Sequence, residues 1–167
     1  MFPAIVDVGC PRQFFNDPED LMKKLLLALA ALSLVSGAAF ADPIGDRQAL
    51  MKERGKIAGG FAKIAKGEEP FDAATVLASL KTLQDNAARF DVDALFPAGS
   101  ETGGDTTASP KIWEDMAGFK AAADKFRADV DAAVAAPPAD LDAFKASFGQ
   151  IASNCGICHK AYRIPKG

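Results

Sequence analysis

The chain contains very little histidine and cysteine. Its 167 residues include one histidine, His159, and three cysteines, Cys10, Cys155 and Cys158. A metal site with two histidine ligands is therefore excluded, and any nucleophile–histidine pair would have to use His159. A structural zinc site needs four nitrogen or sulfur ligands, whereas the C-terminal region supplies two thiols and one imidazole. The residues best suited to chemistry thus lie in one short stretch near the C-terminus.

Basic clusters and apolar runs of membrane-spanning length are also missing. Residues 42–167 contain 16 Lys and Arg against 18 Asp and Glu, without a basic run, which argues against nucleic-acid binding. A transmembrane helix needs about 20 apolar residues, and the most apolar stretch is interrupted by Ser33, Ser36 and Gly37. The composition therefore indicates a weakly acidic protein that does not bind nucleic acid. Once mature, it is not expected to span a membrane.

The segment 22–41 has the layout of a secretory signal peptide. Lys23 and Lys24 form a basic start, an apolar stretch follows, and Ala39-Phe40-Ala41 is an A-x-A cleavage site. The mature protein is then predicted to begin at Asp42 and to work in the periplasm. A buried or membrane helix is the alternative interpretation of this segment.

Residues 1–21 place an acidic stretch in front of this signal. We interpret them as an over-extended start that is not part of the mature protein, with Met22 as the true initiator. Cys10 would then be irrelevant to function. The mature segment, 42–167, is long enough for one domain with its own core.

The C-terminal region contains a C-x-x-C-H motif, Cys155-Gly-Ile-Cys158-His159. This motif is typical of covalent c-type haem attachment: each thiol adds across one porphyrin vinyl group, and the histidine becomes the proximal iron ligand. A thioredoxin-like redox pair is the alternative, but it belongs near a βαβ pattern that the sequence lacks. The predicted cofactor is one covalent haem c, and because bacteria attach haem outside the cytoplasm, the motif agrees with export.

Apolar residues recur with helical spacing, and no useful length of sequence alternates with the period of a strand. Gly67, Asp72, Ser109-Pro110 and Pro137-Pro138 supply stop and start signals. The pattern predicts an all-α fold, an antiparallel four-helix bundle with haem near the C-terminal end of the last helix. The expected helices are 44–66, 72–91, 110–134 and 140–163, with a long loop over 92–109.

Further marks make the mature chain resemble class II cytochromes c, the cytochrome c-prime family. They are Arg47-Gln48, Lys66-Gly67, Pro70-Phe71-Asp72, Gly103-Gly104-Asp105, Pro110-Lys111-Ile112-Trp113, and the C-terminal motif continued through Tyr162-Arg163. The resemblance implies a four-helix bundle with C-x-x-C-H near the end of the last helix. Trp113, Phe71 and Tyr162 are interpreted as packing residues.

The resemblance also implies roles for individual residues. Cys155 and Cys158 match the thioether positions and His159 the proximal iron ligand. Arg47 matches an arginine near a haem propionate, for which a guanidinium offers a bidentate fork; a solvated surface arginine is the alternative. Arg163 matches a basic residue near the proximal imidazole, where a cation would tune the iron. Its alternative is a charge favoured by the dipole of the last helical turn.

Met51 occupies the position that faces the other side of the iron in this family. As an iron ligand it would give the low-spin, methionine-ligated branch, whose ligation suits outer-sphere electron transfer. The alternative is a flexible apolar plug over the haem. Met116, the other methionine of the mature chain, has the spacing of a core residue.

Two functions from different classes follow. The first is a periplasmic electron carrier that serves redox partner proteins and is not an enzyme. The second is a five-coordinate, high-spin protein that binds or sequesters NO or CO. A third alternative is an interaction protein that forms homodimers through its first two helices.

Overall fold

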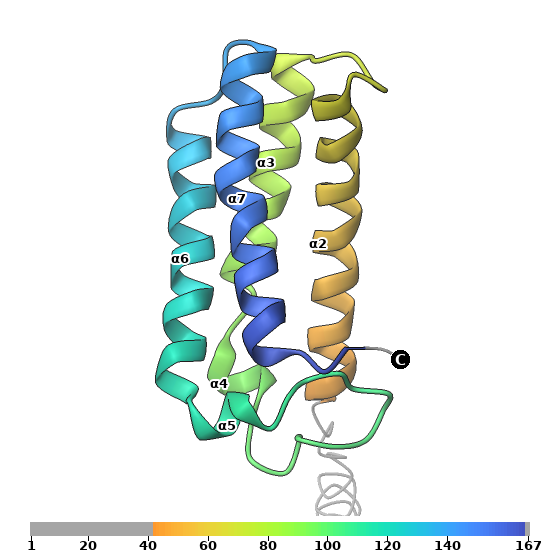
Figure 1. The fold of residues 1–167 in the computed structure, drawn as a ribbon, viewed down its shortest axis with the longest axis vertical. Coiled ribbons are helices and arrows are strands. Elements are labelled where there is room, and N and C mark those ends of the chain that lie inside the picture. The colour runs from red at the N-terminus through yellow and green to blue at the C-terminus, as the bar shows by residue number, and fades with distance from the viewer. Residues whose placement is uncertain (1–41, 166–167) are drawn as a thin grey trace, which may run out of the picture. The chain divides into compact units, whose positions relative to one another are not determined.

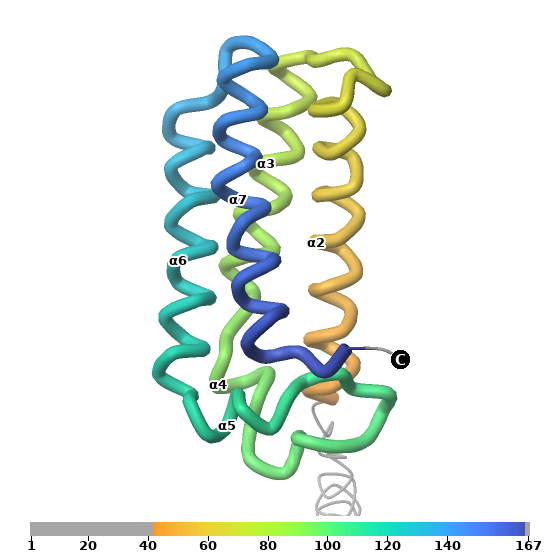
Figure 2. The backbone as a smooth tube through the Cα atoms, viewed as in Figure 1, coloured from red at the N-terminus to blue at the C-terminus, as the bar shows by residue number. Residues whose placement is uncertain are grey.

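The computed structural model describes residues 42–165, which fold around four long helices. Figure 1 and the backbone trace in Figure 2 show these four helices running alongside one another, with two short helices at one end. The bounds are α2 (Pro43–Lys66), α3 (Ala73–Ala88), α4 (Val92–Leu95), α5 (Lys111–Glu114), α6 (Met116–Ala135) and α7 (Leu141–Tyr162). Within these residues there is no strand, only an isolated bridge between Ala108 and Arg163. The predicted all-α four-helix bundle is confirmed.

An aspartate side chain caps the N-terminus of each long helix. An oxygen of each aspartate accepts a hydrogen bond from a backbone N–H in the first turn, which satisfies a donor that the helix itself leaves unpaired. The caps are Asp42, Asp72, Asp115 and Asp140. At the other end of α2, Gly67 takes the left-handed conformation (φ 77°) that glycine adopts without steric cost.

The third predicted helix is not continuous, contrary to the expectation from the sequence. The chain forms α5, then leaves helical geometry at Asp115 (φ −132°, ψ 54°), and restarts as α6. The Asp115 carboxylate accepts from the Gly118 N–H at 3.1 Å, a local bond that competes with helix continuation.

Two other boundaries also differ from the prediction. The second helix ends at Ala88 rather than at residue 91, and the predicted loop 92–109 contains the short helix α4, which Asp91 caps.

The two predicted N-terminal segments, 1–21 and 22–41, lie outside the described residues. None of the helices within 42–165 is both long and apolar enough to span a membrane.

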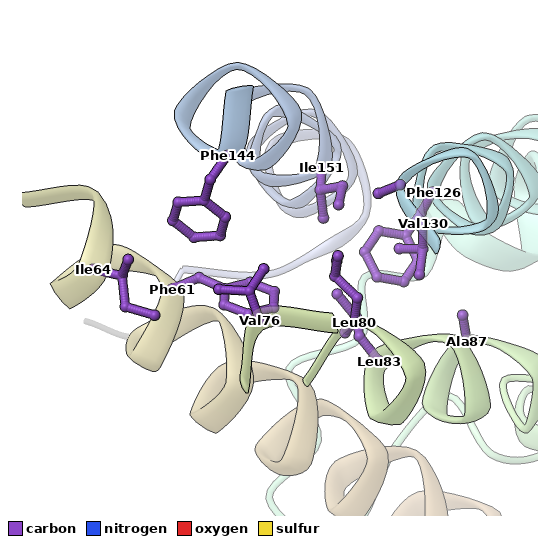
Figure 3. Packing of buried hydrophobic residues seen from close by; sticks show 11 residues of the cluster. Phe61, Ile64, Val76, Leu80, Leu83, Ala87, Phe126, Val130, Phe144 and Ile151 are labelled. Carbon is purple, nitrogen blue, oxygen red and sulfur yellow. The ribbon is translucent and has the colours of Figure 1, made fainter. Parts of the chain in front are cut away.

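Two apolar clusters fill the bundle. The first joins the second half of α2 to α3, α6 and the first half of α7, and Figure 3 shows its side chains pointing toward one another. Its members are Phe61, Ile64, Val76, Leu80, Leu83, Ala87, Phe126, Val130, Ala133, Phe144 and Ile151. The second cluster contains Leu50, Phe90, Val92, Leu95, Phe96, Ile112 and Phe119, and Cys158 and Met51 pack against it. The haem motif therefore lies beside the second cluster.

Phe144 is the residue of the first cluster whose loss should cost most. It is 1% exposed and meets Phe61 edge to face at 5.5 Å between ring centroids. We expect Phe144→Ala to lower the free energy of unfolding by about 3–5 kcal/mol, through lost burial and a residual cavity. Urea unfolding followed by circular dichroism measures this. Ile164→Ala, at an exposed position, is the control and should change stability by less than about 0.5 kcal/mol. Equal small losses in both variants would contradict the prediction.

Candidate functional site

The C-terminal half of α7 carries the three residues of the motif on one face. Cys155, Cys158 and His159 stand at i, i+3 and i+4, positions that are neighbours on a helix surface. Both cysteines are free and partly buried, so no disulfide competes for their sulfurs. The motif is thus arranged to present two thiols and an imidazole to one partner.

All three side chains line a single cavity of about 720 Å³. This volume lies in the range of about 300–1,000 Å³ that is usual for small-molecule and cofactor sites. The walls come from α2, α5, α6, α7, the 105–108 segment, Phe90 and Phe96, and most of the surface that they expose to the cavity is apolar. Besides the motif they include Arg47, Met51, Arg54, Phe90, Phe96, Ile112, Phe119, Ala123, Phe126, Tyr162 and Arg163.

The residues present fit a haem c. Two thiols and an imidazole lie on one wall and mainly apolar surface on the others, which matches the attachment and burial that a porphyrin requires. Zinc fits poorly, because the part of the chain that the structure describes contains no group of three or more His, Cys, Asp or Glu side chains able to hold a metal ion. A thioredoxin-like pair fits poorly too, since residues 42–165 form no βαβ unit.

The electrostatic setting favours a neutral imidazole. Burial lowers the pKa of His159, and the positive charges of Arg163 and Arg54 lower it further. A neutral imidazole is the form that binds a metal. Burial also raises the pKa of the Cys158 thiol, against a smaller opposite effect of Arg54.

Met51 reaches this cavity from α2. Its side chain is partly buried and packs against the second apolar cluster, as Cys158 does. The cavity is therefore bordered by the thioether of Met51 and the imidazole of His159, which come from different helices. Whether the sulfur bonds the iron stays a prediction.

Arg47 is a buried side chain, so its interpretation as a solvated surface arginine is wrong. It is 4% exposed. Its Nη1 donates to the Leu95 carbonyl and to Ser100 Oγ, both at 3.1 Å. Its Nη2 donates to the Ser100 carbonyl at 2.7 Å and to Thr106 Oγ1 at 2.8 Å. Arg47 thus holds the 95–106 segment against α2, and its contact with a propionate stays a prediction.

Tyr162, the last residue of α7, and Arg163, which follows it, line the cavity. The Arg163 N–H donates to the His159 carbonyl at 3.2 Å, and the Arg163 side chain is exposed. The Tyr162 hydroxyl donates to Asp115 Oδ2 at 2.8 Å, and its ring meets Phe119 edge to face. The charge of Arg163 lowers the pKa of His159, and its effect on the iron stays a prediction. Tyr162, interpreted from the sequence as a packing residue, lines the cavity.

Arg54 is a further cavity residue that the sequence reasoning missed. It lies on α2 at i+7 from Arg47 and i+3 from Met51, so the three residues share one helix face. That spacing was a usable signal, because two members of the face were already candidates.

Comparison with known proteins agrees with this geometry. The sequence model of the family described as Cytochrome C' matches residues 42–163. A cytochrome c-556 from Agrobacterium fabrum is 39% identical over 146 residues, which cover 87% of this chain and 97% of the relative.

Solved structures agree as well. Cytochrome c' from Rhodopseudomonas palustris matches with a TM-score of 0.70 and 40% identity over 76% of this chain and 99% of that one. A mutant cytochrome c prime from Alcaligenes xylosoxidans, solved as a nitric oxide complex, matches with a TM-score of 0.65 and 33% identity over 75% and 95%.

Proposed function

Since this chain belongs to the cytochrome c' family, we propose that it is a periplasmic electron carrier whose iron is held between His159 and Met51. Its cofactor is one haem c, attached covalently. We assign the two thioether bonds to Cys155 and Cys158, which line the cavity beside His159. The observation that carries the proposal is the presence of a thioether and an imidazole in one cavity with two thiols.

The residues of the chain would support one-electron transfer without bond chemistry on a substrate. When bound, haem supplies an iron that cycles between ferric and ferrous states. The Cys155 and Cys158 sulfurs hold the cofactor, His159 donates its neutral imidazole, and the aromatic wall excludes water. Methionine/histidine ligation raises the reduction potential and suits outer-sphere transfer. No enzyme activity is indicated by the relatives, which are cytochromes c' and c-556.

A second candidate is a protein that binds NO or CO at an open iron position. The Alcaligenes relative that was solved with nitric oxide favours this function. Here Met51 would act as a flexible apolar plug rather than as a ligand, because its unbranched side chain adapts to irregular space. The two candidates differ only in whether the Met51 sulfur bonds the iron.

Optical and EPR spectra of the holoprotein, matured in a periplasm, separate the two. We expect a low-spin spectrum that carbon monoxide does not change after reduction, because Met51 fills the sixth position. A high-spin spectrum that shifts with carbon monoxide would favour the gas-binding candidate instead. Absence of covalent haem would overturn both.

The protein is also proposed to work in the periplasm and to meet a basic redox partner. The predicted signal at 22–41 supports periplasmic localisation, as does covalent haem attachment, which bacteria carry out outside the cytoplasm. Residues 42–167 have a small negative formal charge before two haem propionates are added, which suits a basic redox partner. A homodimer through the first two helices is retained as an alternative assembly.

A further inference from the structure

Arg54 is a charged side chain inside a cavity whose walls are otherwise mostly apolar. It lies one turn after Met51 on α2 and borders the same cavity as Cys155, Cys158 and His159. We propose that the guanidinium of Arg54 is a fixed cation of the haem pocket that raises the reduction potential of the iron. This inference rests on the proposed function, since it requires a haem in the cavity.

Two aromatic rings hold the guanidinium. Its central carbon lies 4.1 Å from the ring centroid of Phe126 on α6 and 4.9 Å from that of Phe90, which follows α3. Cations at these distances are attracted by the negative face of the ring, and more strongly when water is excluded. The charge of Arg54 is therefore held on the cavity wall.

A buried asparagine fixes the orientation of the Arg54 side chain. Arg54 Nε donates to Asn86 Oδ1 at 2.9 Å. Asn86 is fully buried, and its Nδ2 donates to the Leu50 carbonyl at 3.0 Å and to Glu53 Oε2 at 2.9 Å. Because Asn86 ties α3 to α2 through these bonds, Arg54 is attached to a rigid part of the bundle rather than to a mobile side chain.

Among residues 42–165 no carboxylate forms a salt bridge with Arg54. The neighbouring Glu53 forms its salt bridge with Arg89. Arg54 Nη2 is buried without a hydrogen-bond partner. Burial lowers the pKa of Arg54 to about 10, against a smaller opposite effect of the Glu53 charge, which favours the cationic form. The side chain therefore remains charged at neutral pH.

A fixed positive charge acts differently on the two oxidation states. Ferric iron carries one more positive charge than ferrous iron, so repulsion by Arg54 destabilises the ferric state more. The interaction grows as the local dielectric constant falls, and salt screens buried charges much less than exposed ones. The expected consequence is a higher reduction potential that depends little on ionic strength.

Redox titration of the holoprotein tests this inference. Arg54→Gln removes the charge but keeps a polar side chain for Asn86, and Arg54→Met removes the charge with an apolar side chain. We expect both to favour the ferric state about tenfold, a fall of about 59 mV for a one-electron couple. The fall should persist in high salt. Lys56→Gln removes one charge from an exposed position of the same helix and should leave the potential nearly unchanged.

The conservative variant separates charge from packing. Arg54→Lys should retain most of the wild-type potential, because it keeps a cation at the site. The inference is overturned if Arg54→Gln binds haem covalently and titrates at the wild-type potential. The inference is equally overturned if the reduction potential of Arg54→Lys falls as far below the wild-type value as that of Arg54→Gln. Failure of the proposed function would show itself differently, as a wild-type protein that lacks covalent haem or has a high-spin spectrum that shifts with carbon monoxide.

Discussion

Serine at both Cys155 and Cys158 is expected to abolish covalent haem attachment completely. A hydroxyl does not form the thioether bonds that the two sulfurs supply, while the change from sulfur to oxygen leaves α7 itself intact. The measurement is haem staining of the denatured protein after electrophoresis, together with its intact mass. We expect the double variant to lose both the stain and the mass of one haem, and each single variant to retain one thioether at most.

Cys10→Ser is the matched control for this experiment. It makes the same chemical change in the segment 1–21, which we predict to be absent from the mature protein. Staining and mass of the mature protein should then equal those of the wild type. A double variant that still carries haem through denaturation would contradict the assignment of the two thioether positions.

Met51→Leu is expected to convert the iron from low spin to high spin and to open it to carbon monoxide. Leucine has no donor atom for the iron, but it is close to methionine in volume, and such swaps usually cost less than about 1.5 kcal/mol of stability. The fold should therefore persist while the sixth position becomes vacant. EPR of the ferric protein measures the spin state, and carbon monoxide titration of the ferrous protein measures the open position. We expect nearly all molecules of the variant to be high-spin and to bind carbon monoxide.

Met116→Leu provides the comparison. Met116 packs against the same second apolar cluster as Met51 but does not line the cavity. Its replacement should leave the spin state and the response to carbon monoxide unchanged. If Met51→Leu has a wild-type spectrum, Met51 is not an iron ligand and the gas-binding candidate gains support.

The bundle was predictable because its helices are specified locally. Apolar residues at helical spacing, together with signals such as the Asp72 cap and the Pro137-Pro138 break, mark the long helices in the sequence itself. The break at Asp115 was not predictable in this way. Its carboxylate caps α6 and also accepts from Tyr162, 47 residues away, and a contact over that distance leaves no periodic trace in the sequence.

The residues of the candidate site likewise fall into two groups, those that the sequence identified and those that only the packing of the helices brings together. Cys155, Cys158 and His159 were visible because attachment chemistry requires a fixed spacing, and Arg47 and Met51 came from the family resemblance. The four hydrogen bonds of Arg47 reach Leu95, Ser100 and Thr106, 48 to 59 residues away. Those partners, like the stacking of Arg54 on Phe126, depend on how the helices pack and could not be read from α2 alone.

The placement of the cavity between α2 and α7 has a consequence for the order of events in biogenesis. Arg47 and Met51 are synthesised early and His159 late. The end of α7 meets the 107–109 segment through backbone hydrogen bonds: the Ser109 N–H donates to the Tyr162 carbonyl, and the Ile164 N–H donates to the Thr107 carbonyl. Contacts between such distant parts of a chain raise the contact order and slow folding. A nascent chain without α7 lacks one wall of the cavity, so the enclosure is completed only when α7 arrives with the cysteines themselves.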